Sequence, residues 1–336
     1  MRRLMVWIMV LAGLGAGLCT AANAQTVLRY NRWLPVEHHM EKNVFIPWMQ
    51  KVAEVTQGRV RIEPTSSSLG SILKQYDMVT TGVADVVFTA ESYSPGLFPL
   101  AEILTVPFVG TDVEKLSVAY WQVYEKHLAQ SNPYPKVHLL ALTAFPPYHF
   151  FNSKREISLP DHIKGLKMVS SGQFRTDFLN KMGATVVSAG LTQLVEMISN
   201  GTVDGTFLTD DAIKSFGVAR VVKYRTDFPG GLGTASSFIA MNEQKWLAIS
   251  ERDRNAISAI SGLALARQMG VSLKAADAVA RDEIAKAGIP TITASGALLT
   301  AARDAAAPIE TQWIAMAKEK NVDGVAALRM LRDLSK

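Results

Sequence analysis

A regular alternation of strand and helix patterns near the middle of the chain constrains the fold more than any other feature. Residues 166–169 are a short apolar run and residues 185–187 are β-branched, and both patterns are typical of buried strands. Residues 174–182 and 192–199 carry apolar side chains at helical spacing, and each pattern stops at a turn that contains glycine. A third strand pattern follows at 203–207. The sequence therefore predicts a βαβαβ unit.

The carboxyl ends of these predicted strands mark a candidate binding edge. Parallel strands joined by right-handed helical crossovers place their carboxyl ends at one edge of the sheet, and ligands bind at such edges. The segments that leave the strands are 169–171, 189–191 and 207–210. We therefore expect ligand contacts from Val169, Ser170, Leu191, Phe207 and Asp210.

Two motifs in this stretch carry a resemblance to a known family. Residues 161–167 read DHIKGLK and residues 200–205 read NGTVDG, with Met182-Gly183-Ala184 between them. In this order they resemble the solute receptors of TRAP (tripartite ATP-independent periplasmic) transporters. Residues 57–60 (QGRV) and 106–108 (VPF) extend the resemblance over most of the chain.

The resemblance implies both a fold and a function. The fold it implies is α/β, a two-lobed periplasmic-binding-protein-like fold that closes around one small ligand, usually an organic acid. The partners it implies are the small and large membrane components of a TRAP permease, which receive the ligand from the closed receptor. It implies no catalysed reaction and no cofactor.

The order of the predicted elements divides the chain into two lobes. We expect a first lobe from residues 25–145 together with about 238–270. A second lobe, with the bracing helices, is expected from residues 146–237 together with about 271–336. Each lobe is large enough to bury its own core.

Crossing segments and long helices are predicted from the same patterns. The chain is expected to cross between the lobes at 145–151 and to return at 234–239. Residues 250–287 contain neither proline nor a turn cluster and predict one long helix, which in the family braces both lobes. Residues 308–320 predict an amphipathic C-terminal helix.

The N-terminal residues 1–24 have the three parts of a secretory signal peptide. Two arginines precede an apolar stretch, which ends at the small-residue site Ala22-Asn23-Ala24. We therefore expect export to the periplasm, with cleavage after Ala24. A lipoprotein signal that uses Cys19 is an alternative, but Leu18 before it is larger than such a site normally accepts. A membrane anchor is a further alternative, and the apolar stretch is short for a span.

The charge and cysteine content narrow the function classes. The formal net charge is +5 over 336 residues, and no block of lysines and arginines occurs, so nucleic acid is not expected as a partner. The single cysteine lies in the predicted signal peptide. The exported chain would therefore carry no disulfide and would depend on its hydrophobic cores.

The sequence departs from the family at positions that hold the ligand. In the family an arginine after the GLK motif pairs with the ligand carboxylate in bidentate fashion, and the resemblance places Val169 there. A second family arginine aligns with Tyr148, and two polar positions align with Phe207 and Leu208. A buried carboxylate that loses its cation costs about 3–5 kcal/mol. A small C4-dicarboxylate is therefore not expected as the ligand.

The remaining candidates are apolar and aromatic, and they predict a ligand with a flat apolar or aromatic body, such as an aromatic acid. The contacts to that body would come from Trp33, Phe145, Tyr148, Leu191 and Phe207. The polar groups of the ligand would meet Tyr148, His149, Ser170, Glu91 or Asp210. Further candidates for the site are His38, Leu69 and Ser92. For each ring alone, a place in an ordinary hydrophobic core is the competing interpretation.

Arg175 is the candidate that could replace the missing cation. It lies on the predicted helix directly after Val169 and could reach back to a ligand carboxylate. The competing interpretation is a solvated arginine on the outer face of an amphipathic helix.

Metal sites are not expected. His38 and His39 follow Glu37, but adjacent residues on a helix point about 100° apart and rarely share one ion. Asp210-Asp211 together with Glu91 could hold a cation that bridges to the ligand. The competing interpretation is that Asp210 caps the helix that follows it.

Enzymatic function is not expected either. The chain has no G-x-S-x-G, no P-loop and no H-E-x-x-H motif, and no cysteine nucleophile outside the predicted signal peptide. An acid/base pair of His149 and Asp210 leaves a periplasmic lactonase or isomerase as an alternative. A receptor that signals to a membrane sensor is a second alternative.

Overall fold

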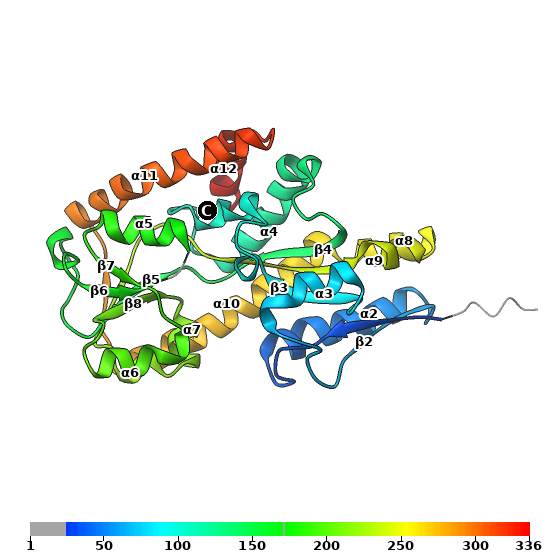
Figure 1. Cartoon of the computed structure of the whole chain (residues 1–336), viewed down its shortest axis with the longest axis horizontal. Helices are drawn as coiled ribbons and strands as arrows, with labels where there is room; N and C mark the ends of the chain where they lie inside the picture. Colours follow the sequence, from blue (N-terminus) through cyan, green and yellow to red (C-terminus); the bar gives the residue numbers. More distant parts are fainter. Residues whose placement is uncertain (1–24, 171) are drawn as a thin grey trace, which may run out of the picture.

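The computed structural model describes residues 25–170 and 172–336. The predicted signal peptide, residues 1–24, and its cleavage site lie outside the described residues. Two sheets, each covered by helices, lie next to each other along the long axis of the molecule (Figure 1). We call the part built on the sheet that contains β1 the first lobe, and the part built on the other sheet the second lobe.

The first-lobe sheet has five strands in the order β2-β1-β3-β10-β4. Strand β1 pairs in parallel with β2 and β3, whereas β10 runs antiparallel to both β3 and β4. Strand β10 thus completes this sheet after the chain has passed through the second lobe. The bounds are β1 Thr26–Asn31, β2 Val60–Pro64, β3 Val86–Ala90, β4 Val137–Ala144 and β10 Ser236–Asn242.

The second-lobe sheet has six strands in the order β11-β9-β5-β8-β6-β7. Strand β6 pairs in parallel with β7 and β8, which confirms the predicted βαβαβ unit. Strand β5 runs antiparallel to β8 and β9. The bounds are β5 His149–Asn152, β6 Lys167–Val169, β7 Thr185–Val187, β8 Gly205–Leu208, β9 Tyr224–Asp227 and β11 Thr291–Thr293.

The two family motifs have structural roles in this sheet. Gly205 of β8 lies opposite Asn152 of β5, and a Cβ atom on Gly205 would come within 2.1 Å of the carbonyl oxygen of Phe151. The Asp204 carboxylate accepts a hydrogen bond from the backbone N–H of Lys167 at 2.8 Å, which ties β8 to β6. These residues therefore set the spacing and register of the strands.

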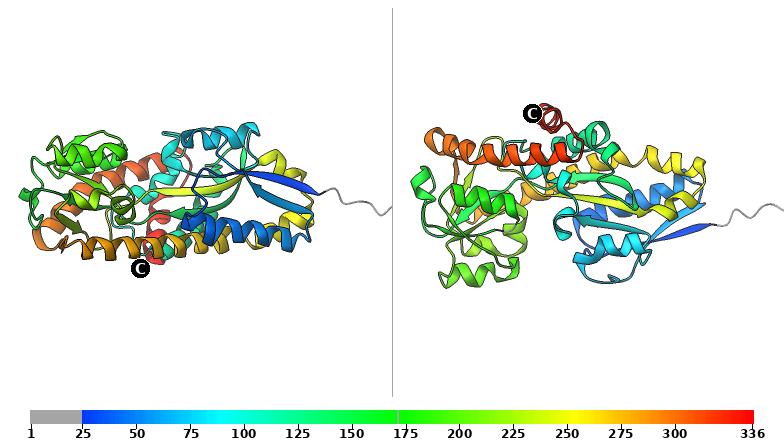
Figure 2. Two further views of the ribbon diagram at one scale, coloured as in Figure 1. Left: turned by 90° about the horizontal axis from the view of Figure 1, so that it is seen from below. Right: turned by 45° about the horizontal axis from the view of Figure 1, so that its top comes forward.

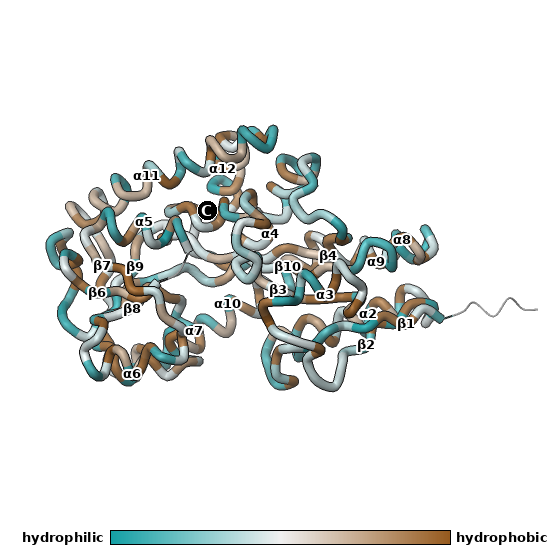
Figure 3. Tube along the Cα trace, in the orientation of Figure 1, coloured by the Kyte–Doolittle hydropathy of each residue, from teal (hydrophilic) through white to brown (hydrophobic). Residues whose placement is uncertain are grey.

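Helices cover both faces of the two sheets. The first lobe contains α2 Ile46–Val55, which follows a π-helical turn at Glu41–Phe45, α3 Gln75–Thr81, α4 Val113–Val123, α8 Glu243–Ala248 and α9 Glu251–Ala259. The second lobe contains α5 Gln173–Lys181, α6 Leu194–Ser199 and α7 Asp210–Ser215. The remaining long helices are α10 Gly262–Lys286, α11 Gly296–Glu319 and α12 Gly324–Leu334. Figure 3 shows that apolar residues are frequent in the strands and recur at intervals along these helices.

Helices α10 and α11 each contribute to the cores of both lobes, and Figure 2 shows them running along both. Met269 of α10 lies in the first-lobe core and Ile284 lies in a second-lobe core. Leu298 of α11 lies in a second-lobe core and Trp313 lies in the first-lobe core. The predicted brace is therefore present, and a second helix shares the role.

The predicted helix bounds need correction at three places. The helix predicted over 250–287 is broken before Gly262, whose φ of 56° is left-handed. The helix predicted to begin at Pro308 begins at Gly296, and the proline lies in its interior. Helix α12 was not predicted, and it packs against the first-lobe core.

The segment Glu251–Lys286 meets the length and composition of a membrane-crossing helix, with a window mean hydropathy of 1.2. This is weak evidence, because 44% of that window is buried inside the protein and core helices pass the same test. The Gly262 break and the burial of Met269 and Ile284 fit a core helix.

The two crossings between the lobes lie side by side. Residues 145–148 lead from β4 to β5, and residues 228–235 lead from β9 to β10. The first crossing was predicted at 145–151, but His149 onward already pairs within the second-lobe sheet. The second crossing was predicted at 234–239, but Ser236 onward already pairs within the first-lobe sheet. The Thr234 hydroxyl joins the crossings by donating to the carbonyl oxygen of Phe145 at 2.8 Å.

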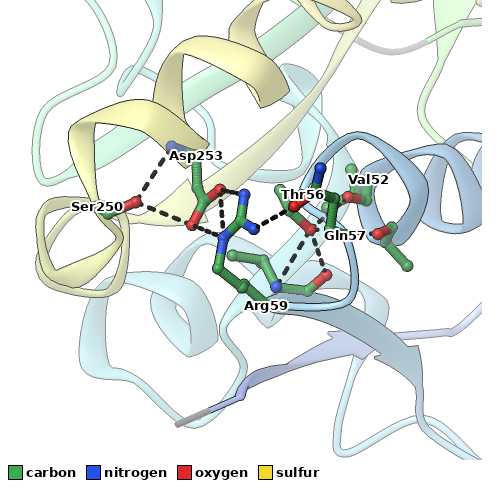
Figure 4. Close-up of polar contacts among 8 residues, drawn as sticks. Val52, Thr56, Gln57, Arg59, Ser250 and Asp253 are labelled. Carbon is green, nitrogen blue, oxygen red and sulfur yellow. Dashed lines mark hydrogen bonds and ion pairs between the residues drawn. The ribbon is translucent and has the colours of Figure 1, made fainter. Parts of the chain in front are cut away.

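Far from the second lobe, an ion pair fixes the start of α9 against β2. The Arg59 guanidinium donates to the carboxylate of Asp253 from Nε at 3.1 Å and from Nη2 at 2.7 Å (Figure 4). The Ser250 hydroxyl caps α9 by accepting from the backbone N–H of Asp253 at 3.2 Å, and it donates to the same carboxylate at 2.9 Å. This contact holds the outer helices of the first lobe in place.

Candidate functional site

A cavity of about 510 Å³ lies between the two lobes. The first lobe supplies the short 3₁₀ helix that follows β3, the loop after it and the 3₁₀ helix at Pro99–Thr105. The second lobe supplies the start of α5. The residues that line it include Glu91, Ser92, Pro95, Phe98, Ala101, Glu102, Thr105, Gly172, Gln173, Phe174, Arg175, Ala235 and Ser236.

Arg175 brings a positive charge to this cavity. Its Nη1 donates to the hydroxyl oxygen of Tyr148 at 3.3 Å, and its Cζ lies 4.8 Å from the centre of the Tyr148 ring. The Tyr148 ring in turn lies 5.3 Å from that of Phe207. Helix α5 begins at this place, so the positive end of its dipole adds to the charge of Arg175. The second-lobe wall therefore favours an anionic group.

The first-lobe wall of the cavity contains a buried acid. Glu91 is 7% exposed, and its Oε1 accepts from the Tyr134 hydroxyl at 2.8 Å. The Tyr134 and Tyr120 hydroxyls lie 3.0 Å apart. Burial raises the pKa of Glu91 to about 7, although the bonds from Tyr134 and Ser236 lower it. Near neutral pH this carboxyl therefore holds a proton for part of the time.

Glu102 is the second acid of the cavity. Burial raises the pKa of Glu102, and the charge of Arg175 lowers it. The positive charge of Arg175 in the second lobe therefore already interacts with the Glu102 carboxyl of the first lobe. An anionic ligand would compete with Glu102 for this electrostatic interaction with Arg175.

Three of the predicted residues line the cavity, namely Glu91, Ser92 and Arg175. Tyr148 reaches it through its contact with Arg175. Phe145 is half-buried and packs against the first-lobe core. Trp33 donates from its ring nitrogen to the carbonyl oxygen of Phe88 at 2.8 Å and stacks on the Phe88 ring. Whether Trp33 and Phe145 touch the ligand stays a prediction.

Several predicted residues lie in or against the hydrophobic cores of the second lobe. Phe207 is buried among Phe150, Phe178 and Tyr148. Val169 is buried and Leu191 packs against the same core. The aromatic cluster thus supports the wall that carries Tyr148.

His149 and Asp210 belong to a buried charge network. Asp210 pairs with Arg225 through two bonds of 2.8 and 2.9 Å, and Arg281 of α10 lies 3.3 Å away. Burial lowers the pKa of His149 to about 3, and its Nε2 lies 3.8 Å from Asp210, beyond hydrogen-bond distance. Arg281 also pairs with Asp277, so the network joins the second-lobe sheet to α10. Thr209, and not Asp210, caps α7.

The other candidates are not among the lining residues of the cavity. The His38 ring stacks on that of His39 at 4.4 Å, and His39 contacts Ser272 of α10 at 2.8 Å. Leu69 is 44% exposed, and Ser170 is buried. Over residues 25–170 and 172–336, no group of three or more His, Cys, Asp or Glu side chains is arranged to hold a metal ion.

The sequence patterns missed most of the first-lobe wall. Phe98, Ala101, Glu102 and Thr105 come from an irregular stretch without helical or strand periodicity. One signal was available, because Glu102 is a lone carboxylate within the apolar run 98–109.

Comparison with known proteins assigns the chain to a family. The family described as DctP, bacterial extracellular solute-binding protein family 7, matches residues 31–316. This chain belongs to that family. The resemblance drawn from the motifs at 161–167 and 200–205 is thereby confirmed.

Solved structures of TRAP receptors share the fold of this family 7 protein. A TRAP periplasmic solute-binding protein from Bordetella bronchiseptica, with bound (R)- and (S)-mandelate, is 28% identical with a TM-score of 0.83, covering 92% of this chain and 98% of its own. A TRAP solute-binding protein from Rhodoferax ferrireducens, in complex with copurified benzoate, is 26% identical with a TM-score of 0.79. The match covers 93% of this chain and 98% of that receptor.

A relative was also found by sequence. The outer membrane transporter protein TsaT of Comamonas testosteroni is 34% identical over 326 residues, which is 96% of this chain and 95% of TsaT.

The family 7 protein described here is thus a TRAP solute-binding receptor with the predicted two-lobed α/β fold. Proteins of this family are periplasmic receptors that bind small molecules and work with the membrane components of a permease. The family and the solved structures that share its fold are binding receptors and not enzymes.

Proposed function

We propose that this receptor captures an aromatic acid in the cavity between its lobes. The observation that carries the proposal is the position of Arg175, which reaches a cavity with a mostly apolar surface and rests on the Tyr148 ring. In this arrangement Arg175 and the first turn of α5 hold the ligand carboxylate. Phe98, Ala101 and Phe174 hold the ring.

The size and composition of the cavity support such a ligand. A volume of about 510 Å³ lies within the range of roughly 300–1,000 Å³ that is usual for small-molecule sites. An aromatic ring that buries roughly 150 Å² of apolar surface gains about 4 kcal/mol. One paired carboxylate orients the molecule. The mandelate and benzoate found in the two related receptors have the same two parts.

Binding would close the two lobes and would leave the ligand unchanged. A molecule that contacts both walls of the cavity binds the closed form better and so shifts the population toward it. The crossings at 145–148 and 228–235 would supply the hinge. We also propose export to the periplasm with cleavage after Ala24.

Titration of the mature chain, residues 25–336, with benzoate, mandelate and succinate tests this proposal. Calorimetry should show benzoate or mandelate binding at least tenfold more tightly than succinate. Tight succinate binding with no aromatic preference would refute it. Mass spectrometry of the ligand recovered after prolonged incubation should show an unchanged molecule, whereas a converted product would favour the enzyme alternative.

A further inference from the structure

A second cavity, of about 470 Å³, lies against the second crossing between the lobes. Pro229 and Gly230 of that crossing line one side of it, and helices α11 and α12 line another. Pro107 and Phe108, from the loop before α4, also line it. None of these residues lines the cavity that contains Arg175, so this is a different site.

The Phe108 ring is a firmly held apolar surface of this second cavity. The backbone of Phe108 has a φ of 65°, a left-handed conformation that is unfavourable for a residue with a Cβ atom. Its N–H donates to the carbonyl oxygen of Gly231 at 2.8 Å, and its side chain packs against a second-lobe core. Strained residues of this kind occur often at ligand sites, where the surrounding structure holds a side chain in place.

Arg303 of α11 brings a positive charge to the Phe108 ring. Its Cζ lies 5.4 Å from the ring centre, so a cation–π contact holds the guanidinium at the cavity. Among residues 25–170 and 172–336, no carboxylate forms an ion pair with Arg303. Arg332 of α12 also lines the cavity, but it donates to the Glu310 carboxylate at 3.0 and 2.6 Å. One positive charge of the lining therefore has no matching negative charge.

We propose that the second cavity binds a small organic acid with one carboxylate and a flat apolar body. The carboxylate would pair with Arg303, because a guanidinium forms two parallel hydrogen bonds to such a group. The apolar body would lie among Phe108, Pro107 and Pro229, in a space of the size usual for small molecules. The ligand would thereby contact the second crossing. Nothing in this proposal requires a ligand in the first cavity, so it does not depend on the proposed function.

Backbone amide NMR spectra of the mature chain, residues 25–336, during a titration with benzoate test the proposal. The amides of Phe108, Gly230 and Ala307 should shift in a saturable step with a dissociation constant on the order of 1 mM. The amides of Gln173 and Phe174 report binding in the first cavity separately. Benzamide has the same ring without the charge, and it should bind at the second cavity at least tenfold more weakly than benzoate.

Two substitutions on the exposed side of α11 should remove the second site in different ways. Arg303→Met removes the charge, whereas Ala307→Trp fills the cavity and keeps the charge. Each should weaken the step at the second cavity at least tenfold and leave the step at the first cavity within threefold. Lys318→Met removes one positive charge from the same helix outside the lining, and it should change neither step. An unchanged amide spectrum away from the substitution shows that each variant is folded.

Three results would overturn the proposal. The amides around the second cavity could show no saturable step of their own. The step could persist in Arg303→Met or in Ala307→Trp, or it could weaken equally in Lys318→Met. Benzamide could bind there as tightly as benzoate, which would show an apolar surface that does not select for charge. A missing step at Gln173 and Phe174 would instead contradict the proposed function and leave the second site standing.

Discussion

The guanidinium of Arg175 rests on the ring of Tyr148, with Nη1 3.3 Å from the phenol oxygen and Cζ 4.8 Å from the ring centre. The resemblance to the family places Val169 and Tyr148 at positions of family arginines. We propose that Arg175, on the next helix, supplies the positive charge of the site instead. The Tyr148 ring stabilises that guanidinium through a cation–π contact.

Replacement of Arg175 by methionine should therefore weaken aromatic acids much more than it weakens neutral analogues. Benzoate affinity should fall at least tenfold, because a charge-assisted, bidentate contact is lost. Benzamide affinity should change less than threefold. Calorimetry measures both. The control is Lys181→Met, which removes one positive charge from the exposed end of the same helix and should leave both affinities unchanged. Equal losses in the two variants would contradict a specific role for Arg175.

Glu102→Gln should strengthen the binding of aromatic acids. The Glu102 carboxylate shares the cavity with Arg175 and repels a ligand carboxylate when it is ionised. We expect a threefold to tenfold gain for benzoate at pH 8, and a smaller gain at pH 5, where the native carboxyl takes up a proton more readily. Glu125→Gln, an exposed acid outside the cavity lining, serves as the control for overall charge. A loss of affinity in Glu102→Gln would show that this acid holds the ligand.

The second lobe could be predicted well from the sequence because its signals are local. An apolar run marks β6, a β-branched run marks β7, and Gly165 and Gly183 adopt left-handed φ at the turns that precede these strands. The predicted helix bounds were wrong where a local sequence signal was misleading. Pro308 normally starts a helix, but packing of α11 against both lobes carries the helix through it.

The site could be predicted only in part because its residues are distant in the chain. Glu91 and Arg175 follow strand patterns, so their place at a strand end or helix start was visible in the sequence. Phe98 directly precedes the 3₁₀ helix Pro99–Thr105, and Glu102 lies in it. The sequence of this segment has no periodicity that shows which side chains face the cavity. Asp210 also follows a strand, but its pairing with Arg225 depends on β9 lying nearby, which no local pattern reveals.

The free energy of unfolding should fall as the pH rises from 6.5 to 8. Burial raises the pKa of Glu41 and of Glu91 to about 7, so the folded protein keeps protons that the unfolded chain has already lost. Their stabilising contribution is complete below the usual pKa of a glutamate and is lost as the pH rises through about 7. Each proton lost changes the free energy of unfolding by about 1.4 kcal/mol per pH unit. Ionisation of the two acids should therefore lower the free energy of unfolding by about 1–2 kcal/mol between pH 6.5 and 8.

Below pH 6.5 the buried histidines act in the opposite direction. Burial lowers the pKa of His149 to about 3 and those of His39 and His138 to about 4, so the unfolded chain takes up protons first and stability falls on acidification. Urea titrations of the mature chain at several pH values between 6.5 and 8 measure the fall in unfolding free energy. The variant with Glu41→Gln and Glu91→Gln should lose most of this slope above pH 6.5. If the unfolding free energy of this variant fell with pH as steeply as that of the unchanged protein, groups other than Glu41 and Glu91 would cause the fall.

Arg225→Met should destabilise the second lobe without acting on the ligand. Arg225 and Asp210 are both buried and share two hydrogen bonds, so the substitution leaves a buried carboxylate with fewer partners. A loss of about 3–5 kcal/mol in unfolding free energy is expected from denaturant titration. The double variant Arg225→Met with Asp210→Asn should recover part of it, because the unpaired charge is gone. Benzoate affinity, measured below the melting temperature, should change less than threefold; a tenfold loss would place Asp210 in the binding site.

Two motif glycines that look equivalent in sequence should respond differently to alanine. Gly205→Ala would place a Cβ atom 2.1 Å from the carbonyl oxygen of Phe151 and 2.8 Å from Cα of Asn152, so β5 and β8 would have to separate. Forced overpacking of this kind costs at least about 1–3 kcal/mol. Gly201→Ala meets open space and is disfavoured only by its φ of 76°, at about 1 kcal/mol. Thermal unfolding of the two variants should therefore show a clearly larger drop in Tm for Gly205→Ala. Equal drops would mean that the strand pair is able to relax around the new methyl group.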